Sequence, residues 1–171
     1  MKKLLIRVRK MNKSPKVVVI IAFICIIVLC LFYIYPRSIN ITYSAIEYQA
    51  GNIQMEKPVK INIDGFYYNK ILSKDTFGGS ITISGKKLKI EKLEVNTNGQ
   101  LLYGINDKGD VVSYGTVCAN NEMSSLTICI LKNGGWSSKD GLMLSAPSKG
   151  RADALNISNN LIGSFILNKL K

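Results

Sequence analysis

The sequence predicts an α+β protein in which an N-terminal transmembrane helix precedes an antiparallel β-sheet domain, with a C-terminal amphipathic helix packed on the sheet. Three observations predict this fold class: an uncharged apolar run, a series of alternating apolar and polar residues bounded by turn residues, and a final stretch with helical apolar spacing. We expect four parts: a basic cytoplasmic tail at 1–16, a transmembrane helix at 17–35, a linker with a first strand at 36–56, and a mostly β domain at 57–171 ending in a helix at about 149–169.

The transmembrane prediction rests on residues 17–35, VVVIIAFICIIVLCLFYIY, which contain no charged side chain. A helix of this length is roughly 28 Å long, close to the thickness of the hydrocarbon core of a bilayer. Because most of its side chains are Val, Ile, Leu or Phe, insertion into lipid is favourable by about 4–8 kcal/mol. Tyr33 and Tyr35 suit the outer membrane–water interface, and Pro36 ends the helix.

Orientation follows from the charges beside the span. Residues 1–16 hold seven Lys or Arg and no acidic residue, whereas only Arg37 closely follows the span. The positive-inside rule therefore places the N-terminus in the cytoplasm and the domain outside the cell membrane. The alternative is a cleaved signal peptide, but its apolar region is usually about 7–15 residues long, and Tyr43-Ser44-Ala45 puts a bulky residue where cleavage needs a small one. We expect an uncleaved single-pass anchor.

Composition excludes several function classes. The net charge is +12, but residues 37–171 hold 16 basic and 11 acidic residues, a net of only +5 (16 − 11). A nucleic-acid partner, which needs a strongly basic folded face, is therefore not expected. The chain has no histidine, which removes imidazole catalysis and nearly all zinc, copper and non-haem iron sites. We assign no catalytic residue, no cofactor and no metal ligand.

The β domain begins with two alternating runs, 59–63 and 81–83. Gly65 follows the first run and is expected to turn the chain, and Gly85 follows the second. These runs predict strands with one buried face and one solvated face.

A change of parity marks the next strand. Leu88 and Ile90 fall on one face of an extended chain, whereas Leu93 and Val95 fall on the other. A shift of one residue predicts a β-bulge near Glu91-Lys92.

Turn residues divide the remainder into short strands. We expect a hairpin turn at Asn98-Gly99, a second turn at 106–110, and a last strand that Pro147 ends. The strands themselves are expected at 101–105, 111–118, 126–131 and 142–145, so the sheet has about six to eight strands.

The C-terminal stretch follows helical rather than alternating spacing. An amphipathic helix must bury its apolar stripe, and the sheet is the available surface. Asp153 near the start and Lys169 near the end suit the helix dipole. The residues expected on the buried stripe are Ala154, Leu155, Ser158, Leu161, Ile162, Phe165 and Ile166.

Two stretches resemble those of a group of small membrane-anchored proteins from low-GC Gram-positive bacteria. The run FGGSITISG at 77–85 is similar to an F-x-G-x-I-x-I-x-G strand, and LSAP at 144–147, followed by Arg151 and ALNI at 154–157, is similar to the entry of a final helix. The resemblance covers roughly residues 57–165. It implies such a host and a strand-to-helix ending, and because the group is uncharacterised it implies no site residue.

The four cysteines have different interpretations. Cys25 and Cys30 are small apolar members of the predicted span. Cys118 and Cys129 lie on the two arms of a predicted hairpin, where a disulfide outside the cytoplasm would contribute about 3 kcal/mol. The alternative is a pair of buried free thiols, and the hairpin register decides between the two.

A basic run and an aromatic run are the candidate binding features. The lysines could contact an anionic envelope polymer or lipid headgroups; alternatively they form a solvated strand face or keep sheet edges from associating. Residues 66–68 (FYY) cannot all face one side of a strand, so at least one aromatic ring is expected to be exposed. The lysines of the basic run are Lys86, Lys87, Lys89 and Lys92.

These features favour a non-enzymatic module, anchored in the lipid bilayer, whose extracytoplasmic domain binds another envelope or membrane protein. One alternative is a surface for an anionic envelope polymer or lipid headgroups. Another is a small envelope-acting enzyme that uses Asp, Glu, Ser or Lys side chains. Residues 84–87 match the S-x-x-K motif of such enzymes, but the motif requires its serine to open a helix, and Ser84 is expected to end a strand. The enzyme requires a cleft where two of these residues converge: Asp64, Asp75, Asp107, Asp110, Asp140 and Lys87.

Overall fold

The computed structural model describes residues 15–97, 99–105, 108–163 and 170, and the chain divides into two compact units between Tyr35 and Pro36. The first unit contains helix α1, Pro15–Ile34, with proline at its first position, where a backbone N–H is not needed. None of its residues is buried, and α1 is long and apolar enough to cross a membrane, as a membrane anchor or a signal sequence would be. Residues 1–14 of the basic tail lie outside the described residues.

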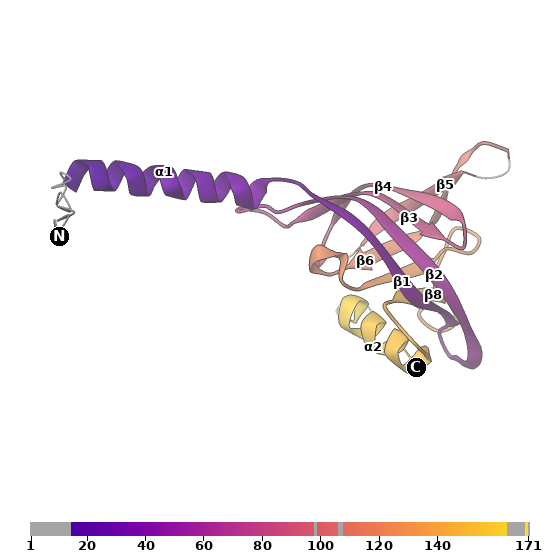
Figure 1. The fold of residues 1–171 in the computed structure, drawn as a ribbon. Coiled ribbons are helices and arrows are strands. Elements are labelled where there is room, and N and C mark those ends of the chain that lie inside the picture. Colours follow the sequence, from indigo (N-terminus) through magenta and orange to yellow (C-terminus); the bar gives the residue numbers. More distant parts are fainter. Residues whose placement is uncertain (1–14, 98, 106–107, 164–169, 171) are drawn as a thin grey trace, which may run out of the picture. The chain divides into compact units, whose positions relative to one another are not determined.

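The second unit contains a closed barrel of eight antiparallel strands in chain order (Figure 1). The predicted antiparallel sheet is confirmed, and its closure goes beyond the prediction. Residues 46–49 of the first strand pair with residues 142–145 of the last, so these two edges cover each other. The strands are β1 Arg37–Gln49, β2 Asn52–Tyr68, β3 Thr76–Ile83, β4 Lys86–Glu94, β5 Gln100–Ile105, β6 Val111–Ala119, β7 Leu126–Ile130 and β8 Leu142–Ala146.

The stretch expected as a linker with a first strand, 36–56, contributes all of β1 and the start of β2. β1 alternates like the later strands, and Ile39, Ile41 and Tyr43 pack against the barrel core. β1 and β2 pair from Arg37 opposite Tyr67 to the turn between the two strands, which makes one long hairpin.

Gly65 does not turn the chain, contrary to the prediction, because β2 continues through it to Tyr68. The glycine serves close packing instead. It faces Gly79 on β3, and a Cβ at position 65 would lie 2.3 Å from the carbonyl oxygen of Gly78 and 2.9 Å from Cζ of Phe77. Only a residue without a side chain fits beneath that ring.

The bulge predicted near Glu91-Lys92 is confirmed. Phe77 pairs with Leu93 and Gly79 pairs with Ile90, so β4 has one residue more than β3 between these two pairs. The two bulge residues are both exposed, and Leu93 returns to the core. The extra residue therefore restores the inward direction of the apolar side chains.

The remaining turns agree with the prediction where they are described. β6 and β7 form a hairpin in which Val117 pairs with Ile128. β8 ends at Ala146, before Pro147. Asn98 and residues 106–107, which belong to two of the predicted turns, lie outside the described residues.

The barrel interior is filled by side chains from all eight strands. An eight-stranded barrel is narrow enough for its own side chains to fill it. Each strand contributes at least one buried residue to this core; one from each strand, in chain order, is Ala45, Ile61, Ile81, Leu88, Leu102, Val117, Ile128 and Leu144.

The C-terminal helix packs on the outside of the barrel, as predicted (Figure 1). Helix α2, Arg151–Ile162, lies against β7, β8, β1 and β6. Ala154, Ser158 and Ile162, spaced by four residues, form its buried stripe. The described helix is shorter than the predicted 149–169, and Phe165 and Ile166 of the expected stripe lie outside the described residues.

Candidate functional site

Four hydroxyl groups meet between α2 and the barrel wall. Ser158 Oγ lies 2.5 Å from the Tyr48 hydroxyl, 2.6 Å from Ser145 Oγ and 3.1 Å from Thr127 Oγ1. All four side chains are fully buried. A substrate cannot reach a cluster that is enclosed in this way, so we interpret it as the polar contact that holds α2 in place.

The two cysteines of the domain are buried free thiols on neighbouring strands, β6 and β7. Cys118 pairs with Thr127, and Cys129 pairs with Thr116, so the two cysteines are diagonal neighbours. Diagonal neighbours have Cα atoms about 7–8 Å apart, wider than the usual disulfide spacing. Burial raises the pKa of the Cys118 thiol to about 11; burial and then the neighbouring Cys118 raise the pKa of the Cys129 thiol to about 12.

The acidic residues considered for an enzyme lie in different parts of the barrel. Asp75 sits at the base of the loop after β2, Asp110 precedes β6, and Asp140 lies in the loop before β8. Asp107 lies outside the described residues. Within the ranges that the structure describes, no three His, Cys, Asp or Glu side chains form a group that could hold a metal ion.

A groove, here called the outer groove, runs along the outer face of β3. The outward positions of this strand carry small side chains, Gly78, Ser80 and Thr82, because the alternate positions point into the core. Two adjoining hollows, of about 630 Å³ and 450 Å³, share Gly78, Gly79 and Lys89 and together form the groove.

Aromatic and aliphatic side chains form the apolar part of the outer groove. On the β2 side, Phe66 is 51% and Tyr68 is 39% exposed, whereas Tyr67 between them is buried in the core. This confirms that the aromatic run divides between the two faces of the strand. On the far side, Ile105 and Val111 line the larger hollow and are mostly exposed. Such a gathering of exposed apolar side chains is typical of an interaction surface.

Three of the four predicted lysines line the outer groove. Lys87 and Lys89 line the larger hollow, and Lys89 and Lys92 line the smaller one. Lys89 Nζ lies 4.0 Å from a Glu91 carboxylate oxygen, and Lys92 Nζ lies 3.3 Å from one of Glu94. Because these pairs are exposed to solvent, each contributes little to stability and leaves its lysine available to an anionic ligand.

Lys86 lies apart from the other three lysines. Its Nζ is 5.2 Å from the centroid of the Tyr114 ring, in a cation–π contact. The basic run is therefore not one uniform face, because the strand alternation separates Lys86 from Lys87 and Lys89.

Asp64 and Lys87 are the two enzyme candidates that share a hollow, since both line the outer groove. Asp64 pairs with Ser80, and Ser80 pairs with Lys89, so β3 separates the acidic residue from the lysine strand. Two strand spacings place the two backbones about 10 Å apart. That separation leaves room for a ligand between the walls and does not make a contact pair for acid–base catalysis.

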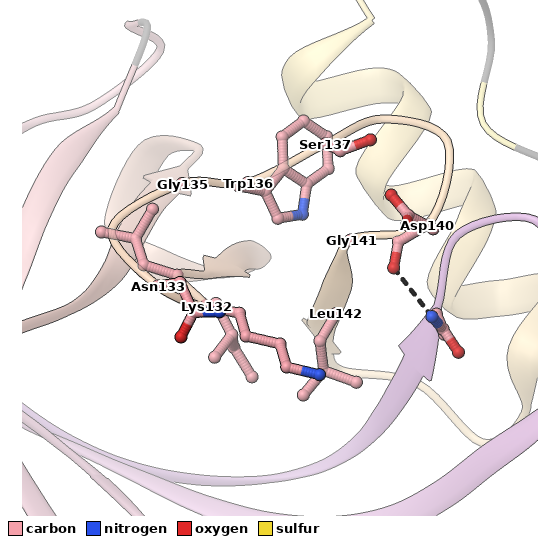
Figure 2. A pocket seen from close by; sticks show the side chains of 11 residues that line it. Lys132, Asn133, Gly135, Trp136, Ser137, Asp140, Gly141 and Leu142 are labelled. Atoms are coloured by element: carbon pink, nitrogen blue, oxygen red, sulfur yellow. Dashed lines mark hydrogen bonds between the residues drawn. The ribbon is translucent and has the colours of Figure 1, made fainter.

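A second hollow of about 630 Å³, here called the Trp136 pocket, lies where the loop between β7 and β8 meets the end of β1 (Figure 2). The indole Nε1 of Trp136 is buried and has no hydrogen-bond partner in the part of the chain that the structure describes. A Cβ at position 141 would lie 2.3 Å from this nitrogen, so Gly141 makes room for the ring. In Figure 2, Lys132 extends along the side of the pocket opposite Trp136, and Gln49 donates a hydrogen bond of 2.9 Å to the Asp140 carbonyl.

The sequence predicted part of these sites. The sequence singled out the lysines and the aromatic run of the outer groove. It did not predict that they form the two walls of one groove. The signal for that arrangement was the small residue at each outward position of β3. Ile105 and Val111 were missed because their neighbours in the groove come from β2, β3 and β4. The Trp136 pocket was missed although its lining is local apart from Gln49, because a turn-rich loop has no regular spacing that shows which side chains enclose a hollow.

No protein-family model, no curated protein and no solved structure matches this chain. A functional proposal therefore depends on the geometry of the sites.

Proposed function

We propose that this chain is a membrane-anchored binding module of the cell envelope of a Gram-positive bacterium. In this proposal α1 is an uncleaved anchor, the barrel lies outside the cytoplasm, and the outer groove holds an extended segment of another envelope protein. The segment carries apolar side chains and at least one acidic residue.

The observation that carries this proposal is the composition of the two walls of the outer groove. Exposed Phe66 and Tyr68 stand on the β2 side, and Lys87, Lys89 and Lys92 stand on the β4 side. Between them the small side chains on β3 let a ligand approach the backbone. Aromatic rings supply apolar contact area, and the lysines favour an acidic partner and fix its direction.

The filled interior supports an external binding surface. Core side chains occupy the space in which many barrels hold a ligand. The apolar part of the outer groove gives most of the expected affinity, since the groove lysines are partly balanced by Glu91 and Asp64.

Photo-crosslinking in native membranes tests the proposal. A photoreactive amino acid replaces Ile105, which lines the outer groove, and, as the control, Asn156, which is exposed on α2. We expect a protein adduct from position 105 and none from position 156. Phe66→Ser or Lys87→Glu should weaken the adduct at position 105, because the first removes an aromatic contact from one wall of the groove and the second reverses a charge on the other.

Three results would count against a protein partner. They are equal adducts at both positions, no adduct at position 105, and an adduct that protease treatment leaves at full size. The last result would instead support an anionic envelope polymer, whose binding should also fall steeply with added salt.

Binding of a small molecule in the Trp136 pocket is a second candidate function. The buried indole N–H of Trp136 has no hydrogen-bond partner among the described residues, and a ligand with an acceptor group would supply one. Trp136 and Lys132 both donate, which favours a ligand with a phosphate or carboxylate group. Trp136 is the single tryptophan of the chain, so its fluorescence reports on this pocket. A saturable change with glycerol 3-phosphate that Lys132→Ala weakens would support this function, and an unchanged spectrum with glycerol 3-phosphate would contradict it.

A further inference from the structure

The loop between β2 and β3 carries two exposed apolar side chains at its tip. Leu72 is 98% exposed and Ile71 is 57% exposed. Lys70 and Lys74 stand on either side of them in the sequence. Two adjacent aliphatic residues held in water between two lysines match the composition of segments that lie in a membrane interface.

The base of this loop is firmly held. The Asp75 carboxylate accepts hydrogen bonds from the backbone N–H of Lys70 at 2.8 Å and from the Tyr67 hydroxyl at 3.0 Å. The backbone carbonyl of Asp75 accepts from the N–H of Val95 at 3.1 Å. Because hydrogen bonds attach both ends of the loop to the barrel, the loop has a defined conformation, and Leu72 is exposed in that conformation.

The loop lies at the end of the barrel where the chain enters it. Arg37 is the first residue of β1 and pairs with Tyr67, shortly before the loop begins. In the sequence, Arg37 follows Ile34, the last residue of α1, by three residues. Three residues of extended chain span at most about 11 Å. This covalent limit holds for any angle of the connection, so a helix that spans a bilayer keeps this barrel end near the bilayer surface.

We propose that the loop docks into the headgroup region of anionic lipid in the leaflet that faces the barrel. Leu72 and Ile71 enter the boundary between headgroups and acyl chains, and Lys70 and Lys74 contact lipid phosphates. The barrel would then be held against the membrane by two points, the anchor and the loop. This inference does not depend on a partner in the outer groove.

Fluorescence quenching in lipid nanodiscs tests the docking with the full chain. In a Trp136→Phe background, Leu72→Trp places the probe at the loop tip. Ile53→Trp is the matched control, since Ile53 is 78% exposed and lies in the β1–β2 hairpin at the other end of the barrel. With brominated lipids in discs that contain phosphatidylglycerol, we expect quenching at position 72 and none at position 53.

The charge contribution is tested in the same discs. Lys70→Glu with Lys74→Glu should reduce the equilibrium constant for docking by about fivefold or more for each lysine in anionic discs. In the unlabelled chain, lipid should protect the docked loop from a protease, and Leu72→Ser should remove that protection. The proposal is overturned if brominated lipid leaves the probe at position 72 unquenched, if it quenches position 53 equally, or if charge reversal leaves the quenching unchanged.

Discussion

At the scale of single residues, burial controls the chemistry of the reactive groups. Desolvation opposes the charged form of a buried thiol or phenol, so it raises the pKa of both. The pKa of Tyr48 is raised by burial, although hydrogen bonds to Ser158 and Ser145 partly oppose the shift. Burial likewise raises the pKa of Tyr67 to about 12. These phenols therefore stay protonated at neutral pH, and their hydroxyl groups form hydrogen bonds with Ser158 and Asp75.

The cysteines provide the first prediction. Because the thiol pKa values of Cys118 and Cys129 are about 11 and about 12, almost no thiolate exists at pH 8. We expect a maleimide to leave both unmodified in the folded chain and to modify both after unfolding in urea without a reductant. Rapid labelling of the folded barrel would contradict the burial. Failure to label the unfolded chain until a reductant is added would reveal a disulfide.

Tyr67 provides a prediction about alkaline pH. Its folded pKa of about 12 lies above the ordinary value of 10.0, so the unfolded chain loses the proton first. The resulting stability is fully present below pH 10 and is lost as the pH rises to about 12. Urea unfolding should show a smaller loss between pH 10 and pH 12 for Tyr67→Phe than for the natural chain. At pH 8 the variant should be less stable by about 1 kcal/mol, since the hydrogen bond to Asp75 is gone. Parallel pH profiles for the two chains would refute the assignment.

At the scale of elements, α2 contacts the barrel through polar as well as apolar side chains. Ser158 is the common partner of Tyr48, Ser145 and Thr127, and all four side chains are fully buried. The stripe of α2 was predicted from its spacing, but a buried serine looked like any small residue. Its role depends on three residues from β1, β7 and β8, which the helical pattern does not contain.

This arrangement predicts the result of one substitution. Ser158→Ala removes the shared hydroxyl, which is one of the two hydrogen-bond partners of the buried Tyr48 hydroxyl, so the free energy of unfolding should fall by about 1–3 kcal/mol. The control is Asn156→Ala, on the exposed side of the same helix, which should change stability by less than about 0.5 kcal/mol. Urea unfolding in detergent, followed by the fluorescence of Trp136, measures both. Equal effects of the two substitutions would show that the hydroxyl cluster does not hold the helix.

At the scale of the whole molecule, the chain joins an apolar helix that is long enough to cross a membrane to a barrel with its own core. α1 buries none of its residues, whereas the second unit has a filled core. The charge asymmetry of the sequence sets the expected direction across the membrane, since seven basic residues precede the span.

The expected topology can be measured with a membrane-impermeant thiol reagent on intact protoplasts. We expect Ser138→Cys, on the exposed loop between β7 and β8, to be labelled. Ser14→Cys in the basic tail should be labelled only after the cells are lysed. The natural cysteines of the barrel should stay silent because they are buried. Labelling of position 14 in intact cells would reverse the topology, and recovery of the labelled barrel from the medium would show that the span is cleaved.

The sequence by itself determined the apolar helix, most strands, the bulge in β4 and the amphipathic end, because each of these follows from the order of neighbouring residues. Tertiary structure decided the rest. Pairing of β1 with β8 closed the barrel, Gly65 proved to serve close packing under Phe77, and the lysine and aromatic runs became two walls of one groove. Each of these depends on which residues meet across strands, and local spacing does not specify such long-range contacts.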